Sequence, residues 1–471
     1  MYKGKRKGTT ELQKIIDNEE GVKARLCVCG DNEENVEDIR RDSPTVNKIN
    51  IKLFYLIAAQ KGWTIKMADV KAAFLQGALL DRDVYLNPPK EMRVPGVIWK
   101  MLKRAYGFVD ASRGFYLELE KTLETTGCQV SKHDPAVFLY FDHDKNQKEI
   151  KGMLLSHVDD FLHGSGCESF EKKVMEPMRK KFLIGDEEAS EFQYVGTKVI
   201  QTTAHIIVNL DRYTEEIQIP DIEEHLDGYK NNEIVDDELQ DIFRSISGKI
   251  GWLSKNARPD LSYDSLVLST LVGKARCSDV KSAIKILRKL KVETTEMRFP
   301  KLGCIEDWTI IGHGDAGFRS LPDKVSSCGG LVVMIGNKTL GRRAIVSWKA
   351  KKIRRVVSSS TAAEVLALND TLDEMVYVRE VLVEILGDKA KRIPLEMYTD
   401  SRNLFKSVMS TSLLENPRLR TDVAKLQQSL KSGESAGIFL VTSQQMLANC
   451  LTKKGASSEL LRRILRKGSL E

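Results

Sequence analysis

Apolar and polar residues follow two different periods along the 471-residue chain, and these periods predict where strands and helices lie. In the first 200 residues, apolar runs and alternating stretches predict strands at 22–28, 63–69, 97–102 and 138–141. Apolar stripes at helical spacing predict helices at 43–59, 112–125 and 169–182. A hairpin is expected over 192–210. Residues 211–291 are mostly helical in pattern, notably 237–255 and 279–291, and a linker is expected near 293–303.

The last third of the chain returns to strands separated by helices. Strands are predicted at 308–313, 329–336, 344–348, 395–399 and 438–441. A long helix is expected to begin after the hydroxyl-rich run 358–361, another helix begins at Asn403, and a third lies around 444–451. The chain is therefore expected to combine a mixed α and β region with a second region in which strands and helices alternate.

Composition places the chain among multi-domain soluble proteins, because 471 residues exceed a single core and the size prior gives about three domains. No apolar run approaches the roughly 18 residues of a membrane span, and no apolar segment follows the basic start. Eight cysteines without paired spacing predict reduced thiols. We therefore expect a cytoplasmic protein, with the nucleus or a virus-like particle as other settings.

Lysine and arginine gather at 3–7, 342–355 and 453–467, although the net charge is only +7. Such clusters are typical of proteins that bind a polyanion. Solvated faces of a mildly basic protein are the alternative for each of them.

Two acidic positions far apart in the chain give the first chemical hypothesis. Residues 153–166 predict a hairpin with Asp159 and Asp160 at its bend, and a solvated hairpin tip is the simpler interpretation. Asp69 ends the strand 63–69, in which the odd positions share one face and are otherwise apolar. A carboxylate that continues an apolar row needs compensation, by a metal ion or by a buried hydrogen-bond network. If the two places meet, their oxygens could surround two Mg²⁺ ions.

At these residues the sequence resembles the reverse transcriptases of copia-type LTR retrotransposons. The resemblance rests on many short stretches, among them Asp69-Val-Lys-Ala-Ala-Phe-Leu-Gln-Gly, Pro88-Pro89, Lys103-Arg-Ala-Tyr-Gly-Phe, Asp134-Pro-Ala-Val-Phe and His157-Val-Asp-Asp. The resemblance covers about 20–471.

The resemblance implies a right-hand polymerase of fingers, palm and thumb, followed by an α/β ribonuclease H-like domain. The expected division is a basic N-terminus (1–22), fingers and palm (23–200), thumb and connection (201–300), the ribonuclease H-like domain (301–456) and a basic C-terminal helix or tail (457–471). The polymerase residues that it implies are Asp69, Asp159 and Asp160 as metal ligands, Phe74 as a steric gate against a 2′-OH, and Lys23, Arg25 and Arg113 as nucleotide or template contacts. The implied cofactor is Mg²⁺ or Mn²⁺.

A second set of carboxylates lies at predicted element ends in the last third. The order strand with Asp315, helix with Glu364, strand with Asp400 and helix is the order of a ribonuclease H fold, in which these three residues would hold metal ions. The related family carries a fourth carboxylate in a Leu-Ala-Asp-x-Leu-Thr-Lys motif, where this chain has Asn449. We therefore expect weak cleavage of RNA·DNA hybrids.

The leading hypothesis is an RNA-directed DNA polymerase with RNA and DNA template-primers, RNA·DNA hybrids and dNTPs as partners. The competing hypothesis is a degenerate or co-opted remnant that binds nucleic acid without catalysis. Departures from the family at Cys29, Asp110 and Asn449 favour the remnant, whereas the retained Asp69, Asp159, Asp160 and Phe74 favour the polymerase. The oligomeric state is left open.

Overall fold

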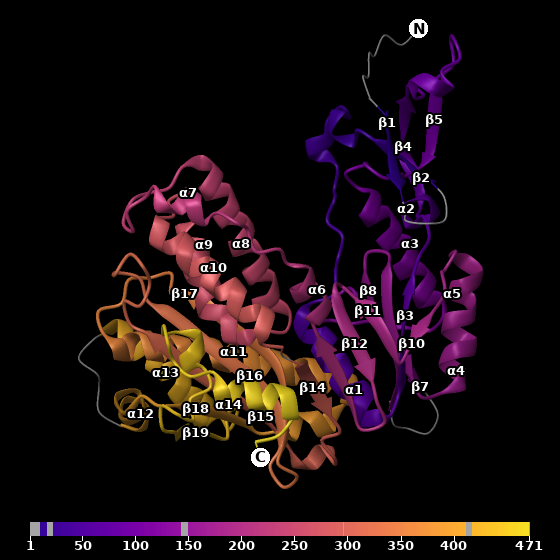
Figure 1. Cartoon of the computed structure of the whole chain (residues 1–471). Helices are drawn as coiled ribbons and strands as arrows, with labels where there is room; N and C mark the ends of the chain where they lie inside the picture. The colour runs from indigo at the N-terminus through magenta and orange to yellow at the C-terminus, as the bar shows by residue number, and fades with distance from the viewer. Residues whose placement is uncertain (1–9, 17–21, 143–148, 295, 411–416, 471) are drawn as a thin grey trace. The chain divides into compact units, whose positions relative to one another are not determined.

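The computed structural model describes residues 10–16, 22–142, 149–294, 296–410 and 417–470, with side chains from Cys27 onward except that of Asp142. Its contacts group the chain into two compact units. Figure 1 colours the chain by residue number, from indigo at the N-terminus to yellow at the C-terminus. Unit 1 comprises 1–47 and 64–189, and unit 2 comprises 48–63 and 190–471. The five segments expected from the sequence remain a prediction.

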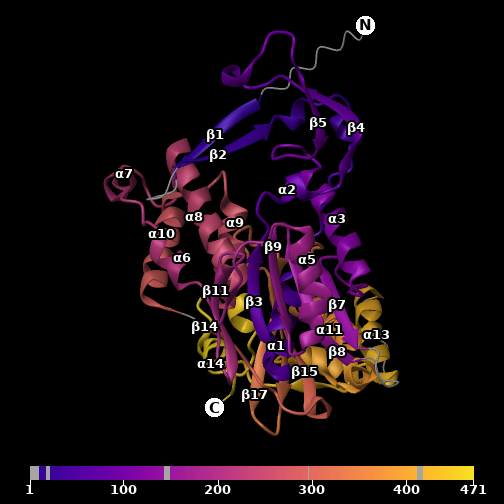
Figure 2. The ribbon, with the colours of Figure 1, turned by 90° about the vertical axis from the view of Figure 1, so that its right-hand side faces the viewer.

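Unit 1 is built on an antiparallel sheet with the strand order β10-β3-β9-β8-β7-β6. The strands are β3 (Thr64–Asp69), β6 (Gln129–Val130), β7 (Val137–Asp142), β8 (Glu149–His157), β9 (Asp160–Ser165) and β10 (Glu188–Ala189). Helix α3 (Ala111–Thr125) and the helical run α4 (Glu168–Phe170), η4 (Glu171–Met175) and α5 (Glu176–Lys181) contribute to one apolar core with the sheet, and Figure 2 shows α3 and α5 beside it. This core includes Phe115, Phe138 and Phe161, each at most 1% exposed.

Two smaller antiparallel ribbons complete unit 1. They are β1 (Thr10–Ile16) with β2 (Val22–Val28), and β4 (Leu79–Leu86) with β5 (Trp99–Lys103). Short 3₁₀ turns, η1 (Gly30–Asn32), η2 (Val36–Asp38) and η3 (Lys90–Met92), and the short helix α2 (Ala73–Gln76) lie between strands. A separate apolar cluster joins Val28, Val84 and Phe108, so the end of β2 packs with β4.

Helix α1 (Lys48–Lys61) lies in unit 2, although the strand that follows it lies in unit 1. Its apolar residues occur on all sides, as in a helix that is covered all round. It packs against β13 (His205–Asn209), β14 (Glu296–Pro300) and β17 (Arg342–Lys352). The helix begins at Lys48, later than the predicted start at 43.

The first sheet of unit 2 has the order β11-β12-β13-β14, with β11 (Glu191–Tyr194) and β12 (Thr197–Gln201) forming a tight hairpin. The prediction of a linker at 293–303 is wrong, because β14 pairs with β13 from Pro300 to Glu296. The predicted helices are confirmed as α8 (Asp237–Asn256) and α10 (Cys277–Val292), with α6 (Asp211–Glu216), α7 (Glu223–Asp227), η5 (Pro259–Leu261) and α9 (Ser262–Leu271) around them.

The second sheet of unit 2 has the order β17-β16-β15-β18-β19, antiparallel among the first three strands and parallel among the last three. Its strands are β15 (Trp308–Gly317), β16 (Cys328–Asn337), β17, β18 (Leu395–Thr399) and β19 (Gly437–Leu440). The long helix α11 (Ser360–Leu386) packs on β15 and β16. The remaining elements are η6 (Ile305–Asp307), η7 (Asp388–Arg392), α12 (Arg402–Met409), α13 (Pro417–Lys431) and α14 (Glu459–Lys467). The predicted helix at 444–451 is wrong, because only the 3₁₀ turn η8 (Asn449–Leu451) forms there.

Two acidic centres as candidate catalytic sites

The first acidic centre lies where three strand ends of unit 1 meet. Asp69 is the last residue of β3 and pairs across the sheet with Asp160, the first residue of β9. Asp160 also pairs with His157, the last residue of β8, so the predicted hairpin is confirmed. The backbone oxygen of Asp159 accepts a hydrogen bond from Val70 N at 3.0 Å. The fold therefore brings Asp69 next to the turn of Asp159 and Asp160, which begins 90 residues further along the chain.

The turn that carries Asp159 has a strained backbone. Val158 has φ +61°, a left-handed conformation that β-branched residues rarely adopt. Such a conformation costs on the order of 1–2 kcal/mol and is found preferentially at functional sites. The hydroxyl of Ser156 donates to the Val158 oxygen at 3.3 Å and helps to hold the turn.

The acids of this centre act on each other electrostatically. Burial, together with the charges of Asp159 and Asp69, raises the pKa of Asp160 to about 6. Asp69 itself is exposed, and along β3 the buried positions are Ile65 and Ala68. The expectation that Asp69 continues a buried apolar row is therefore wrong, so its position needs no compensation for burial.

Phe74, the predicted steric gate, lies on α2 close to this centre in sequence. The ring is half-buried and its centroid lies 4.7 Å from that of Tyr106, tilted by 58°. It packs against both apolar clusters of unit 1. This packing fixes the ring, and its role as a gate stays a prediction.

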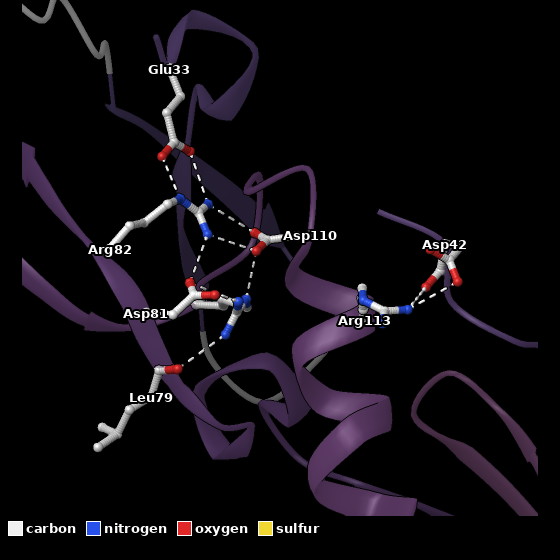
Figure 3. Close-up of polar contacts among 8 residues, drawn as sticks. Glu33, Asp42, Leu79, Asp81, Arg82, Asp110 and Arg113 are labelled. Atoms are coloured by element: carbon white, nitrogen blue, oxygen red, sulfur yellow. Dashed lines mark hydrogen bonds and ion pairs between the residues drawn. The ribbon is translucent and has the colours of Figure 1, made fainter. Parts of the chain in front are cut away.

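Of the three predicted nucleotide or template contacts, the structure describes the side chain of Arg113 alone. Lys23 and Arg25 lie on β2, whose backbone pairs with β1, but their side chains lie outside the described part of the structure. Arg113, in the first turn of α3, forms an ion pair with Asp42 at 2.9 Å (Figure 3). A ligand that used Arg113 would therefore compete with the Asp42 carboxylate.

Asp110 is held in an ion-pair network that the sequence did not reveal. Its carboxylate is buried and accepts hydrogen bonds from Arg82 and from Arg104, each at 2.8 Å. Arg82 also binds Glu33 at 2.6 Å (Figure 3). The two guanidinium groups hold the pKa of Asp110 below its usual value although burial opposes this. Asp110, one of the departures from the family, thus has its carboxylate bound by partners within unit 1.

The second acidic centre lies in unit 2 and is more tightly gathered. Asp315 lies within β15, Glu364 in the first turns of α11, and Asp400 directly after β18. Their carboxylate oxygens all lie within 4.8 Å of one another, and they form the one such group of three possible metal ligands among the residues that the structure describes. Ser359 caps α11 by accepting from Ala362 N at 3.2 Å, which begins the helix that presents Glu364.

Donor groups from the segment 443–453 surround this centre. Lys453 Nζ lies 3.1 Å from Asp315 Oδ1, and the Thr452 hydroxyl donates to Asp315 Oδ2. Ser443 donates to Asp400 Oδ2 at 2.8 Å. Sequence reasoning considered Asn449 and missed these three donors. The Thr-Lys pair that closes the quoted motif was the signal that could have pointed to two of them.

Burial dominates the electrostatics of the second centre. It raises the pKa of Glu364 to about 9, with Asp315 and Asp400 adding to the effect and Lys453 opposing it. Burial also raises the pKa of Asp315 against the influence of Lys453. Burial lowers the pKa of the Lys453 ammonium, but Asp315, Asp400 and Glu364 together raise it above its usual value. Carboxylates that repel each other in a buried site favour a bound cation.

Both centres fit a divalent cation by the chemistry of their donors. Carboxylate oxygens are the ligands that Mg²⁺ prefers in proteins. Three of them lie within 4.8 Å of one another in the second centre, and the first centre carries Asp69, Asp159 and Asp160 at neighbouring strand ends. The raised pKa of Asp160 and the gathered oxygens of the second centre are the observations on which this fit rests.

Comparisons with known proteins agree with this geometry. Residues 9–224 match the family described as reverse transcriptase (RNA-dependent DNA polymerase). Over 92% of its length the chain is 28% identical to the Retrovirus-related Pol polyprotein from transposon RE1 of Arabidopsis thaliana and 24% identical to that from transposon TNT 1-94 of Nicotiana tabacum. The chain spans 29% and 33% of these two relatives.

Among solved structures, a foamy viral protease-reverse transcriptase in complex with an RNA/DNA hybrid has a TM-score of 0.51. The match covers 93% of this chain and 51% of that chain at 11% identity, so it concerns the fold alone. The predicted fold class, a polymerase followed by a ribonuclease H-like domain, is confirmed, as is the resemblance to copia-type Pol polyproteins. Within the described residues, no helix is both long and apolar enough to span a membrane.

Proposed function

We propose that this chain, which is similar to copia-type Pol polyproteins and matches the reverse transcriptase family over residues 9–224, is an RNA-directed DNA polymerase that extends a primer 3′-OH with deoxynucleotides. The observation that carries the proposal is the pairing of β3 with β9, which sets Asp69 opposite Asp160 and beside the turn of Asp159. Reverse transcriptases use divalent metals, and this arrangement offers a set of acidic oxygens for them.

Each residue of the first centre has a proposed part in the reaction. Asp69, Asp159 and Asp160 would hold Mg²⁺ or Mn²⁺, which when bound would steady the attacking and leaving oxygens of phosphoryl transfer. The raised pKa of Asp160 supports a site that gains from a cation. Phe74, fixed against Tyr106, would exclude a ribose 2′-OH from the nucleotide site.

The proposed partners are an RNA or DNA template with its primer, the RNA·DNA hybrid that forms, and dNTPs. A related fold is known in complex with an RNA/DNA hybrid, and the basic clusters at 342–355 and 453–467 suit a polyanion. Cleavage of RNA by the second centre is proposed to be weak, because Asn449 stands where the family has a carboxylate.

Primer extension tests the proposal directly. Purified full-length chain should extend a DNA primer on poly-rA with dTTP and Mg²⁺, and Asp159→Asn should abolish extension. Asp186→Asn, which neutralises an exposed aspartate of the same unit, is the matched control and should extend normally. No extension by the unmutated chain over a range of metal and salt concentrations would reject the activity.

A second candidate function is nucleic-acid binding without catalysis. The ion pair of Arg113 with Asp42 and the neutral Asn449 favour it, because both weaken contacts that a catalyst needs. A binding titration would select it if hybrid affinity falls steeply with salt while no metal-dependent turnover is found.

A further inference from the structure

The amide of Asn449 has a fixed orientation in the second centre. Its Nδ2 donates to the Ser443 backbone oxygen at 2.7 Å, and its Oδ1 accepts from Lys453 Nζ at 2.7 Å. A carbonyl oxygen can only accept and an ammonium can only donate, so the chemistry of the partners excludes the flipped amide. The NH₂ group therefore faces Asp400 Oδ2, at 3.5 Å.

This orientation removes Asn449 from the set of metal ligands. Its carbonyl oxygen, the only atom that could ligate a cation, is already bound by the Lys453 ammonium. A relay of donors and acceptors results, which runs from Asp400 through Asn449 and Lys453 to Asp315.

Lys453 brings a positive charge into the carboxylate cluster. Its ammonium contacts Asp315, whose side chain is 0% exposed, and it is thus the cation that compensates the most deeply buried acid. With all three acids ionised, the carboxylates and this ammonium carry a net formal charge of −2, which one divalent cation balances. A carboxylate at 449 would leave −3 and would favour a second cation.

We propose that Lys453 serves as an internal cation in place of one divalent ion, so that the second centre binds a single ion through Asp315, Glu364 and Asp400. The inference rests on the part of the proposed function that gives these carboxylates to a metal. Lys453 is here a positioning residue, since it acts through Asp315 and Asn449.

Counting bound ions tests the inference without any catalytic assay. The full-length chain would carry Asp69→Asn and Asp159→Asn to silence the first centre, and bound Mn²⁺ would be counted from the free-ion signal in electron paramagnetic resonance. We expect one bound ion in this background and two when Asn449→Asp and Lys453→Met are added. Two ions or none in the background, or one ion in the variant that also carries Asn449→Asp and Lys453→Met, would overturn the inference.

Two further variants guard against a misfolded protein. Asn449→Asp alone replaces an amide by a carboxylate of the same shape and should tighten Mn²⁺ binding about tenfold, as an added charge close to the ion would; unchanged affinity counts against the inference. Lys454→Met changes the exposed neighbouring lysine and should leave the count at one. Because ions are counted without primer or nucleotide and in a chain whose first centre is silenced, the count does not depend on primer extension. Failure of the unmutated chain to extend a primer would leave the inference standing, whereas two ions in the silenced chain would overturn it even if the unmutated chain extends.

Discussion

The two acidic centres differ in how the fold compensates their negative charge. In unit 1 the acids lie at strand ends and in a strained turn, Asp69 is exposed, and the charges of Asp69 and Asp159 act on Asp160. In unit 2 Asp315 is fully buried and is held by Thr452 and Lys453. A carboxylate that water reaches needs less compensation from the protein, whereas a buried one requires donors or a cation.

The difference teaches that acidic residues at element ends do not by themselves define one kind of site. In the first centre Asp69 is exposed and Asp160 is half-buried, and burial and the neighbouring acids raise the pKa of Asp160, which favours an external cation. In the second centre Lys453 already supplies part of the compensating positive charge. Asp110 extends the same rule, because this buried acid of unit 1 is compensated by Arg82 and Arg104.

The largest expected effect separates the two centres by function. Asp69→Asn should lower the rate of primer extension by about 10³-fold or more, because a metal contributes several kcal/mol to phosphoryl transfer. Asp315→Asn should leave extension within about twofold of the unmutated chain. Single-turnover extension measures both, and equal losses in the two variants would end the claim that the centres act separately.

Removing the buried, ion-paired carboxylate of Asp110 should lower the stability of the chain without changing the chemistry of either acidic centre. Asp110→Asn leaves Arg104 without a buried counter-charge, while Arg82 keeps Glu33, and should lower the free energy of unfolding by about 3 kcal/mol. Urea unfolding measures the change, with Asp186→Asn as a control that should stay within about 0.5 kcal/mol. A loss below about 1 kcal/mol would show that solvent already screens the network.

Sugar selection should belong to the first centre alone. Phe74→Val removes ring volume beside Tyr106 and should raise the incorporation of ribonucleotides relative to deoxynucleotides by on the order of 10-fold. The ratio of kcat/KM for rUTP and dTTP measures it. Tyr85→Val, at an exposed aromatic residue of the same unit, is the control. Equal kcat/KM ratios in the two variants would show that Phe74 is not the steric gate.

The smallest expected effect concerns the strained turn. Val158→Gly relieves the left-handed backbone but gives the unfolded chain more freedom, and the balance should raise the free energy of unfolding by about 1 kcal/mol. Thermal or urea unfolding of the full chain detects such a change. A destabilised variant would mean that the valine side chain contributes more than its backbone costs.

Much of the architecture follows from local patterning. The strands 22–28 and 395–399 were predicted with the bounds that the structure gives, because apolar and polar residues alternate along much of each. The pairing of Asp69 with the hairpin was also within reach, since both positions lie at strand ends and the resemblance to a known family linked them.

Other features depend on contacts between distant residues, which periodicity does not encode. The pattern predicted a linker where β14 adds to a sheet through β13, and it predicted a helix where the chain instead turns at Asn449 to place its donors against Asp315 and Asp400.

The sequence by itself determined which acids the chain carries, the order of their elements and the loss of a carboxylate at 449. Only the tertiary structure decided that Asp69 is exposed, that Asp110 is enclosed by two arginines, and that Lys453 stands beside Asp315. The physical reason is that the cost of a charge depends on its distance from water and from other charges, and these distances are set by the packing of the whole unit.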